Sequence, residues 1–500
     1  MSSRKHGKKR KSFLIDKVIV LVLFTLSFSQ SFAKENKTPK DYSVLKEKIT
    51  YNTNQDLTLG PLTLGETIDY AIKNYPSIRA AQSKISAAKS GISLAKTAYL
   101  PKGDAIYQTN RATRNNITGL LFPQNVIPNI SGPAIANPNF GSAWGTATGG
   151  LVSWELLDFG LKRSKVNLAK TDVEKAESEA ELTELELQAK VADTFFKLLT
   201  AQEALKAVEA NVDRAKTFAD SVNVLAKNGL RPGADSSRAL AEVAVARTQL
   251  AQAKQLQEVT RAYLAQLLGV AGKTILIKED RFLNLPSDTD LPIPEVEAHP
   301  ILKLQKSNID LVESRKKVLF HSYFPKLDVQ GALFGRGSGV DHTGDLRGGA
   351  NGLFPTRLNF ASGITANLPL FEWVSIRAKQ KIEKFNEEAE TAKYNELVQE
   401  IIGKFSQAKV IFDSAQEIAK EAKTQLEAAK ISETQTTARF KAGLGTVIEV
   451  ADTQRLLTKS EIEDLIARLG IWEALLNVSI AQGDIKPFLT LSQSNDKEDK

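Results

Sequence analysis

Three carboxylates that follow glycine-marked turns are the residues whose types and spacing most directly suggest chemistry. Asp235 and Glu449 each lie six residues after a glycine, Gly229 in one case and Gly443 in the other. Asp452 follows Glu449 by three residues, so on a helix these two carboxylates share one face. Acids in a first helical turn commonly act only as caps and complements of the helix dipole. A functional concentration of negative charge and a purely structural role both remain open.

Cysteine, methionine and histidine give little support for catalysis or for a metal site. The chain has no cysteine, which excludes a catalytic thiol, a disulfide scaffold and a thiolate metal site. Its single methionine is the first residue, so soft-metal ligands are lacking. The four histidines, at positions 6, 299, 321 and 342, form no ligand-spaced pair. Phosphate-loop and nucleophile-elbow motifs are absent from the sequence, and we predict no cofactor and no enzymatic activity.

The net charge of +8 is concentrated at the N-terminus. Residues 1–33 hold seven Lys and Arg against Asp16, followed by the apolar run 18–24 and the small residues Ser31 and Ala33. This pattern predicts a secretory signal peptide over 1–33. A membrane anchor is the alternative, but the run is shorter than the roughly 20 residues that span a bilayer. Removing this segment leaves 59 basic and 57 acidic residues, too even a balance for nucleic-acid binding.

The remaining chain is an internal duplication. Pro76 recurs as Pro300 at an offset of 224 residues, and Gly229 recurs as Gly443 at an offset of 214. A single 10-residue length difference between Pro76 and Gly229 accounts for the change of offset. Because corresponding residues otherwise stay in register along the two halves, the pattern indicates a repeat. The predicted organisation is an N-terminal extension at 34–61, a first repeat at 62–285, a second repeat at 286–485 and a charged, disordered tail at 486–500.

Each repeat predicts a helix, two strands, a very long helix and a returning helix. Apolar residues alternate with small or polar ones in the strand segments, about 102–115, 143–156, 325–336 and 356–370. A soluble sandwich would also alternate, but four strands are too few for its core, so a barrel wall shared with other subunits is favoured. The segments 161–227 and 375–441 lack proline and show coiled-coil spacing. Each could extend about 100 Å, which requires antiparallel neighbours.

The plan resembles the TolC family of outer-membrane efflux proteins over about residues 60–485. The resemblance is carried by the segments Leu62–Glu66, Asn74–Pro76, Leu157–Gly160 and Pro369–Trp373 and by the turns Lys227–Leu230 and Lys441–Leu444. It implies a mainly α fold with a small β part, in which long antiparallel coiled-coil helices form an α-barrel. It also implies that each protomer of a homotrimer contributes four strands to a 12-stranded transmembrane β-barrel.

The resemblance further implies where the functional ends lie. The turn residues Gly229, Leu230, Gly443 and Leu444 match the periplasmic tip where an adaptor protein docks. Glu449, Asp452 and Asp235 match the entrance gate, where three copies would form a ring that favours cations. In the first copy Arg231–Gly233 departs from the usual small residues. Three tryptophans, Trp144, Trp154 and Trp373, lie near strand ends and either contact the membrane interface or anchor the strand–helix junctions.

The function implied is a passive exit duct in the outer membrane that conducts small molecules such as drugs and toxic compounds. Its partners would be a periplasmic adaptor (membrane fusion) protein, an inner-membrane pump and outer-membrane lipid, but no nucleic acid. A type I protein secretion channel is the main alternative within the family, and a periplasmic coiled-coil structural protein is a weaker one outside it. Because the chain has no cysteine, it would lack a lipid anchor.

Overall fold

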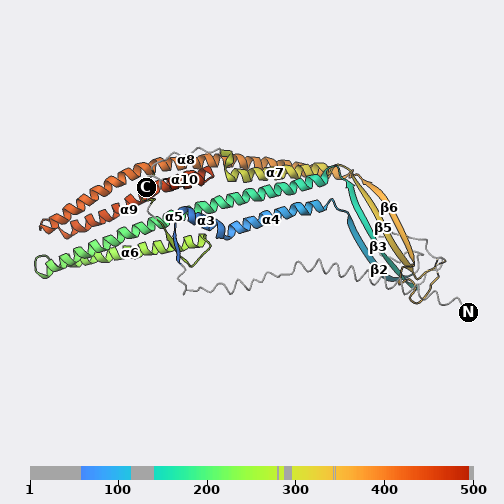
Figure 1. The fold of residues 1–500 in the computed structure, drawn as a ribbon, viewed down its shortest axis with the longest axis horizontal. Coiled ribbons are helices and arrows are strands. Elements are labelled where there is room, and N and C mark those ends of the chain that lie inside the picture. The colour runs from blue at the N-terminus through green and yellow to red at the C-terminus, as the bar shows by residue number, and fades with distance from the viewer. Residues whose placement is uncertain are drawn as a thin grey trace. The chain divides into compact units, whose positions relative to one another are not determined.

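The computed structural model describes residues 58–113, 140–278, 281–286, 296–341, 343 and 345–494. The predicted signal peptide, most of the N-terminal extension and the loop from 114 to 139 lie outside these residues. Two copies of one plan follow each other, and each copy runs from a helix through two strands into a long helical hairpin (Figure 1).

The elements have the following bounds. The first copy contains β1 (Thr58–Leu62), α3 (Leu64–Asn74), α4 (Pro76–Thr97), β2 (Lys102–Thr113), β3 (Ser142–Leu157), α5 (Leu161–Lys227), α6 (Gly233–Leu267) and β4 (Thr274–Ile277). The second contains the 3₁₀ turn η1 (Val296–Ala298), α7 (Pro300–His321), β5 (Lys326–Ser338), β6 (Arg357–Asn367), α8 (Glu372–Lys441), α9 (Val447–Gln482) and α10 (Lys486–Ser494). The expected mainly α fold with a small β part is confirmed.

Local signals explain where the helices begin. Thr63 caps α3 in a reciprocal capping box with Glu66. Proline occupies the first turn of both α4 and α7, where its missing N–H costs nothing. The strands β1 and β4, which the sequence analysis did not predict, pair in parallel beside α3.

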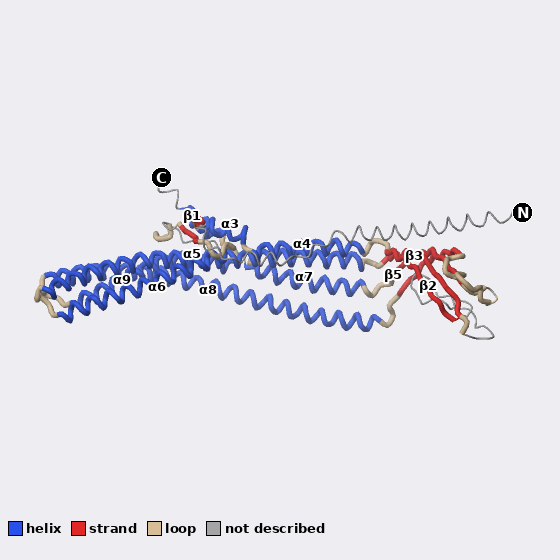
Figure 2. Tube along the Cα trace, turned by 90° about the horizontal axis from the view of Figure 1, so that it is seen from below, coloured by secondary structure: helices blue, strands red, loops and turns tan. Residues whose placement is uncertain are grey.

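A four-stranded antiparallel sheet forms in the order β2-β3-β5-β6 (Figure 1). Figure 2 shows this sheet in red at one end of the long helices. The register pairs Val152 with Gly331 and Leu333 with Phe360, and it therefore places the side chains of Val152, Leu333 and Phe360 on one face. That face is apolar and exposed: Leu333 is 56% exposed and Phe360 81%. The sheet thus presents to its surroundings the kind of side chain that a soluble protein buries.

The helices pack as antiparallel hairpins, with α6 against α5 and α9 against α8. Between α5 and α7, hydroxyl groups meet at a seven-residue spacing: Ser178 lies 3.1 Å from Ser307, and Thr171 lies 3.0 Å from Ser314. Such small polar contacts let the helices approach closely, which fits the predicted coiled-coil packing. The long helices agree with the prediction, except that α8 begins at Glu372 rather than at about 375.

The largest apolar cluster joins the middle of these hairpins to the C-terminal segment. Trp472 on α9 makes edge-on contacts with Phe282 and Phe488, whose ring centroids lie 5.2 and 6.3 Å away. Phe488 belongs to α10 and is fully buried. The prediction of a disordered tail from residue 486 is therefore wrong for 486–494, because apolar side chains at this end complete the cluster.

His299 connects the start of α7 to the end of α9. Its Nδ1 accepts a hydrogen bond from Ile301 N–H at 3.2 Å, capping α7. Burial of the ring lowers the pKa of His299, although a hydrogen bond with the backbone of Ile480 opposes the shift. The folded state therefore binds a proton less readily than the unfolded chain, whose histidine titrates near 6.5. Stability should be complete above that pH and decline as the pH falls below it.

Replacing His299 with asparagine keeps a capping acceptor but removes the titration. We expect the thermal unfolding midpoint of His299→Asn to depend less on pH between 7 and 5 than that of the wild-type protein. The variant should also lose about 1 kcal/mol at neutral pH through the lost contact with Ile480. Parallel pH profiles for the two proteins would show that His299 does not contribute to the acid sensitivity.

Candidate functional site

The hairpin between α5 and α6 turns in a Schellman motif, with glycine at the left-handed position. Gly229 has φ of +74°, and its N–H donates to the carbonyl of Ala226 at 3.0 Å. The N–H of Leu230 then reaches back to the carbonyl of Leu225 at 2.9 Å. This geometry explains why glycine stands at the end of so long a helix.

The second hairpin repeats the motif. Gly443 has φ of +77° and donates to the carbonyl of Phe440 at 3.0 Å, while Leu444 N–H donates to Arg439 O at 2.9 Å. The leucines at these two turns, Leu230 and Leu444, are 69% and 73% exposed. We call the two turns together, residues 228–232 and 442–446, the tip. It carries two apolar side chains in solvent.

Arg231 joins the two halves of the tip. Its Nη2 donates to the carbonyl of Gly445 at 2.9 Å, and its guanidinium lies 4.8 Å from the ring centroid of Phe440. Phe440 in turn meets Phe218 edge-on at 5.0 Å. The residue that departs from the family pattern thus has a defined role, which the sequence analysis did not foresee. Arg231 and Gly445 are repeat equivalents, 214 positions apart. The internal duplication is therefore the feature of the sequence from which this contact could have been predicted.

The three predicted gate carboxylates lie just beyond the tip, but each has a different environment. Glu449 completes a capping box with Thr446: its carboxylate accepts from Thr446 N–H at 3.3 Å, and Thr446 Oγ1 accepts from Glu449 N–H at 3.2 Å. Asp235 stands in the first turn of α6 and is partly buried. Asp452 is exposed and 3.6 Å from Nη1 of Arg455. The capping role is therefore real for Glu449, although its charge also faces solvent.

Arg455 forms a clamp between the two hairpins. Its Nε and Nη2 donate to the Glu242 carboxylate at 3.1 and 2.5 Å, and this links α9 to α6. The carboxylate of Glu242 raises the pKa of Arg455. Farther from the tip, Arg214 of α5 pairs with both oxygens of Glu461 of α9, at 3.1 and 2.7 Å. These bidentate pairs hold the hairpins in one register.

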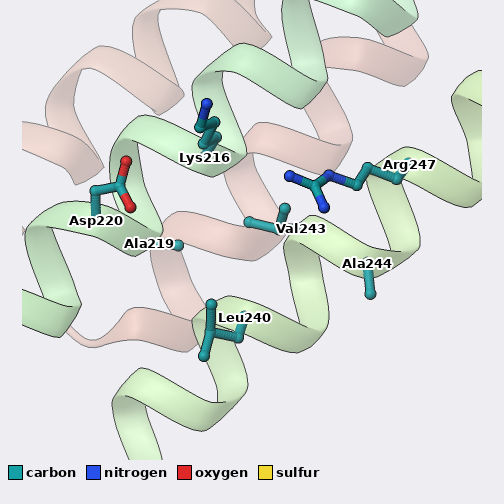
Figure 3. Close-up of a pocket in the computed structure, with 7 residues that line it drawn as sticks. All are labelled: Lys216, Ala219, Asp220, Leu240, Val243, Ala244 and Arg247. Carbon is teal, nitrogen blue, oxygen red and sulfur yellow. The ribbon is translucent and has the colours of Figure 1, made fainter.

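A shallow groove of 370 Å³ lies between α5 and α6 near the tip (Figure 3). Its lining combines apolar and charged side chains: Ala219, Leu240, Val243 and Ala244 with Lys216, Asp220 and Arg247. Such a surface suits a peptide or helix contact rather than the enclosure of a small molecule.

Two of the predicted tryptophans anchor strand–helix junctions. The indole N–H of Trp154 donates to the carbonyl of Tyr99 at 3.0 Å, and that of Trp373 to Tyr323 O at 3.4 Å. Tyr99 and Tyr323 are repeat equivalents, and both indoles stay partly exposed. Trp154 and Trp373 thus both anchor a strand–helix junction. Their exposed ring surface is compatible with a membrane contact as well.

Trp144 has a different environment at the opposite end of β3. It stacks with its cross-strand partner Arg111, whose guanidinium lies 5.6 Å from the indole centroid. The loop after β5 folds against this strand end, where Thr146 Oγ1 donates to Gly352 O at 2.7 Å. A side chain at position 352 would begin 2.1 Å from the carbonyl oxygen of Trp144. Only glycine allows that close approach.

The described residues offer neither a metal-binding cluster nor a helix suited to cross a membrane. Within them, His, Asp and Glu side chains gather nowhere in the groups of three that would hold a metal ion. None of the helices in the same ranges combines the length and apolar character needed to cross a bilayer.

The arrangement of sheet and hairpins matches solved outer-membrane channels. The crystal structure of the Campylobacter jejuni CmeC outer membrane channel superposes with a TM-score of 0.67 at 16% sequence identity. The match covers 86% of this chain and 89% of that one. At this identity the likeness establishes the fold alone, which is that of the solved outer-membrane channels.

The chain belongs to the outer membrane efflux protein family, whose model matches residues 67–270 and 304–483. The predicted class and the outer-membrane location are thereby confirmed. Among curated relatives, Protein CyaE of Bordetella pertussis is 26% identical over 219 residues, covering 44% of this chain and 42% of CyaE. The pyoverdine export outer membrane protein OpmQ of Pseudomonas putida is 22% identical over 334 residues, covering 66% of this chain and 68% of OpmQ. The chain thus matches less than half the length of CyaE.

Proposed function

We propose that this protein is the outer-membrane exit duct of a tripartite efflux system and passively conducts small molecules to the exterior. The observation that carries the proposal is the sheet with an exposed apolar face at one end of long hairpins. An apolar face such as that of Leu333, Phe360 and Ile364 is suited to lipid. The export function in the name of OpmQ supports a small-molecule cargo.

The active form is proposed to be a homotrimer. In the described sheet, β2 and β6 each pair on one side only, which leaves two edges with unsatisfied backbone groups. In lipid such edges are not tolerated, so β6 of one copy would pair with β2 of the next until twelve strands close. The exposed apolar residues of α8, such as Ile382 and Val410, would pack between copies in the same assembly.

The tip is proposed to receive a periplasmic adaptor protein, which in turn contacts an inner-membrane pump. The exposed Leu230 and Leu444 and the shallow groove between α5 and α6 support this role. Glu449, Asp452 and Asp235 are proposed to line the entrance, where three copies of each would favour cations. The clamp between Arg455 and Glu242 would hold this entrance narrow, because it ties α9 to α6.

Deleting the gene tests the proposal directly. We expect a several-fold rise in sensitivity to drugs or dyes, because the pump's substrates would no longer leave the periplasm. Restoring the full chain should restore resistance, whereas a chain lacking the tip turns should not. Loss of one secreted protein from the medium, with unchanged drug sensitivity, would instead indicate a type I secretion channel. Fractionation away from outer membranes would indicate a periplasmic coiled-coil structural protein.

A further inference from the structure

The helical turns next to the sheet carry a marked excess of positive charge. In α5, the first eleven residues, 161–171, contain four Lys and Arg and no acid. In α8, residues 372–382 contain three Lys and Arg and the single acid Glu372. Acidic residues become frequent only farther along both helices, from Asp172 and Glu383 onward. The excess is therefore confined to one end of each long helix.

Six of these side chains form what we call the basic collar: Arg163, Lys165 and Lys170 of α5 and Arg377, Lys379 and Lys381 of α8. All six are exposed. Within the described part of the chain, none of the six forms a salt bridge. Lys381 alone has a partner of another kind, the ring of Phe385 at 5.9 Å.

Several lysines farther from the sheet have an acidic partner. Lys84 pairs with Glu179 at 2.6 Å, Lys197 with Asp193 at 2.7 Å, and Lys404 with Glu400 at 2.6 Å. Farther along both helices acidic residues are interspersed with the basic ones, whereas the two collar segments hold only the acidic residue Glu372. Unpaired cations gathered on one band of a surface indicate an anionic partner outside the chain.

The position of the collar identifies that partner. Leu161 follows the end of β3 by four residues, and Glu372 follows the end of β6 by five. At 1.5 Å per residue, all six collar residues lie within about 14 Å of the start of their helices, which are the ends next to the sheet. The tryptophans Trp154 and Trp373 stand at the same junctions, where amphipathic rings meet the headgroup level of a bilayer.

We propose that the basic collar binds the anionic phospholipid headgroups of the leaflet that faces the helices. This inference rests on the proposed placement of the sheet in the outer membrane. Lysine and arginine near an anionic membrane surface are attracted to it, and the attraction declines within a Debye length, about 8 Å at physiological ionic strength. The collar would thereby fix the depth of the sheet in the bilayer and oppose its displacement when a partner pulls on the tip.

Quenching of tryptophan fluorescence by brominated lipids tests the inference on the full-length protein in vesicles. Quenching by brominated phosphatidylglycerol is compared with quenching by brominated phosphatidylcholine, since Trp154 and Trp373 lie beside the collar. For the wild-type protein we expect at least about a fivefold preference for phosphatidylglycerol, which corresponds to the attraction of a single basic residue. Changing all six collar residues to glutamine should reduce this preference to about onefold.

The matched control removes six positive charges elsewhere on the helices. Arg79, Lys306, Lys409, Lys420, Lys423 and Lys430 are exposed and lie farther from the sheet, and their glutamine variants should keep the wild-type preference. Raising the salt concentration should weaken the wild-type preference without any mutation, which provides a test independent of variant folding. Equal preference in the collar variant and the wild type, or no preference in the wild type, would overturn the inference.

Conductance in planar bilayers separates this inference from the proposed duct function. A collar variant with wild-type conductance and no lipid preference supports both. A wild-type protein that shows the lipid preference without conducting contradicts the duct alone. A collar variant with altered anion selectivity and an unchanged lipid preference would place these cations in the conduction path and overturn the lipid assignment.

Discussion

Replacing Trp472 with alanine should destabilise the protein by about 3–5 kcal/mol, the range for deleting a large buried aromatic side chain. The indole is 1% exposed and joins three segments: α9, residues 281–286 and α10. Its N–H donates to the carbonyl of Asn284 at 2.8 Å, so the substitution also leaves this partly buried acceptor without its donor. The effect should be seen first as loss of order in α10, because Phe488 would lose a ring contact.

Hydrogen exchange of residues 281–286 and 486–494, together with the thermal midpoint, measures this effect. Trp472→Phe keeps an aromatic ring but removes the donor, and it should cost less than the alanine variant. Trp373→Ala is a matched control, since that indole is 43% exposed and its hydrogen bond is longer, at 3.4 Å. Equal losses of stability for Trp373→Ala and Trp472→Ala would show that burial in the aromatic cluster is not what matters.

Local periodicity was sufficient to predict the long elements. Helix α5 has the bounds expected from the sequence, because Gly160 and Gly229 enclose a segment free of proline. The alternating strands were placed within three residues, because one apolar face has to persist along each of them. These features depend on neighbours a few residues apart, which a sequence pattern records directly.

Features that join distant residues were not predicted. The contact of Arg231 with Gly445 and the clamp between Arg455 and Glu242 link residues 214 and 213 positions apart. The duplication brings equivalent turns together, so the repeat offset contains this information, but only once the hairpins are known to lie side by side. Helix α10 was missed for a different reason. The charged residues after Asn495 led to a prediction of disorder for the whole segment 486–500, although Phe488 and Leu489 pack on the aromatic cluster.

The carboxylates near the tip illustrate the limit of a type-based prediction. The residue types were identified correctly as helix-start acids, and the structure assigns Glu449 to a capping box. The sequence did not predict that Arg455 supplies a positive charge beside Asp452. Arg455 lies one turn beyond Asp452, and its main partner, Glu242, is on another helix. Any ring of negative charge at the entrance is therefore partly compensated within each protomer.

Arg455→Gln should have the largest effect on conduction. The substitution leaves the Glu242 carboxylate, whose side chain is only 17% exposed, without its bidentate partner, and it also removes the counter-charge of Asp452. Because Arg455 itself is half exposed, we expect the cost to be about 1–2 kcal/mol, below that of a fully buried pair. The substitution destabilises the state in which α6 and α9 are joined relative to the state in which they are separated. The separated state should therefore become about tenfold more populated. Single-channel recordings in planar bilayers should show this as higher conductance or longer openings.

Charge exchange distinguishes a clamp from general destabilisation. The double variant Arg455→Glu with Glu242→Arg restores an opposite-charge pair and should return the conductance toward the wild-type value, whereas either single reversal should increase it. Glu449→Gln with Asp452→Gln is the comparison for charge alone: glutamine preserves the capping box, so cation selectivity should fall while α6 and α9 stay joined. If Arg455→Gln leaves conductance unchanged while the variant melts at the wild-type temperature, the pair does not restrain the entrance. If the charge exchange fails to restore conductance in a folded protein, the effect of Arg455 does not act through Glu242.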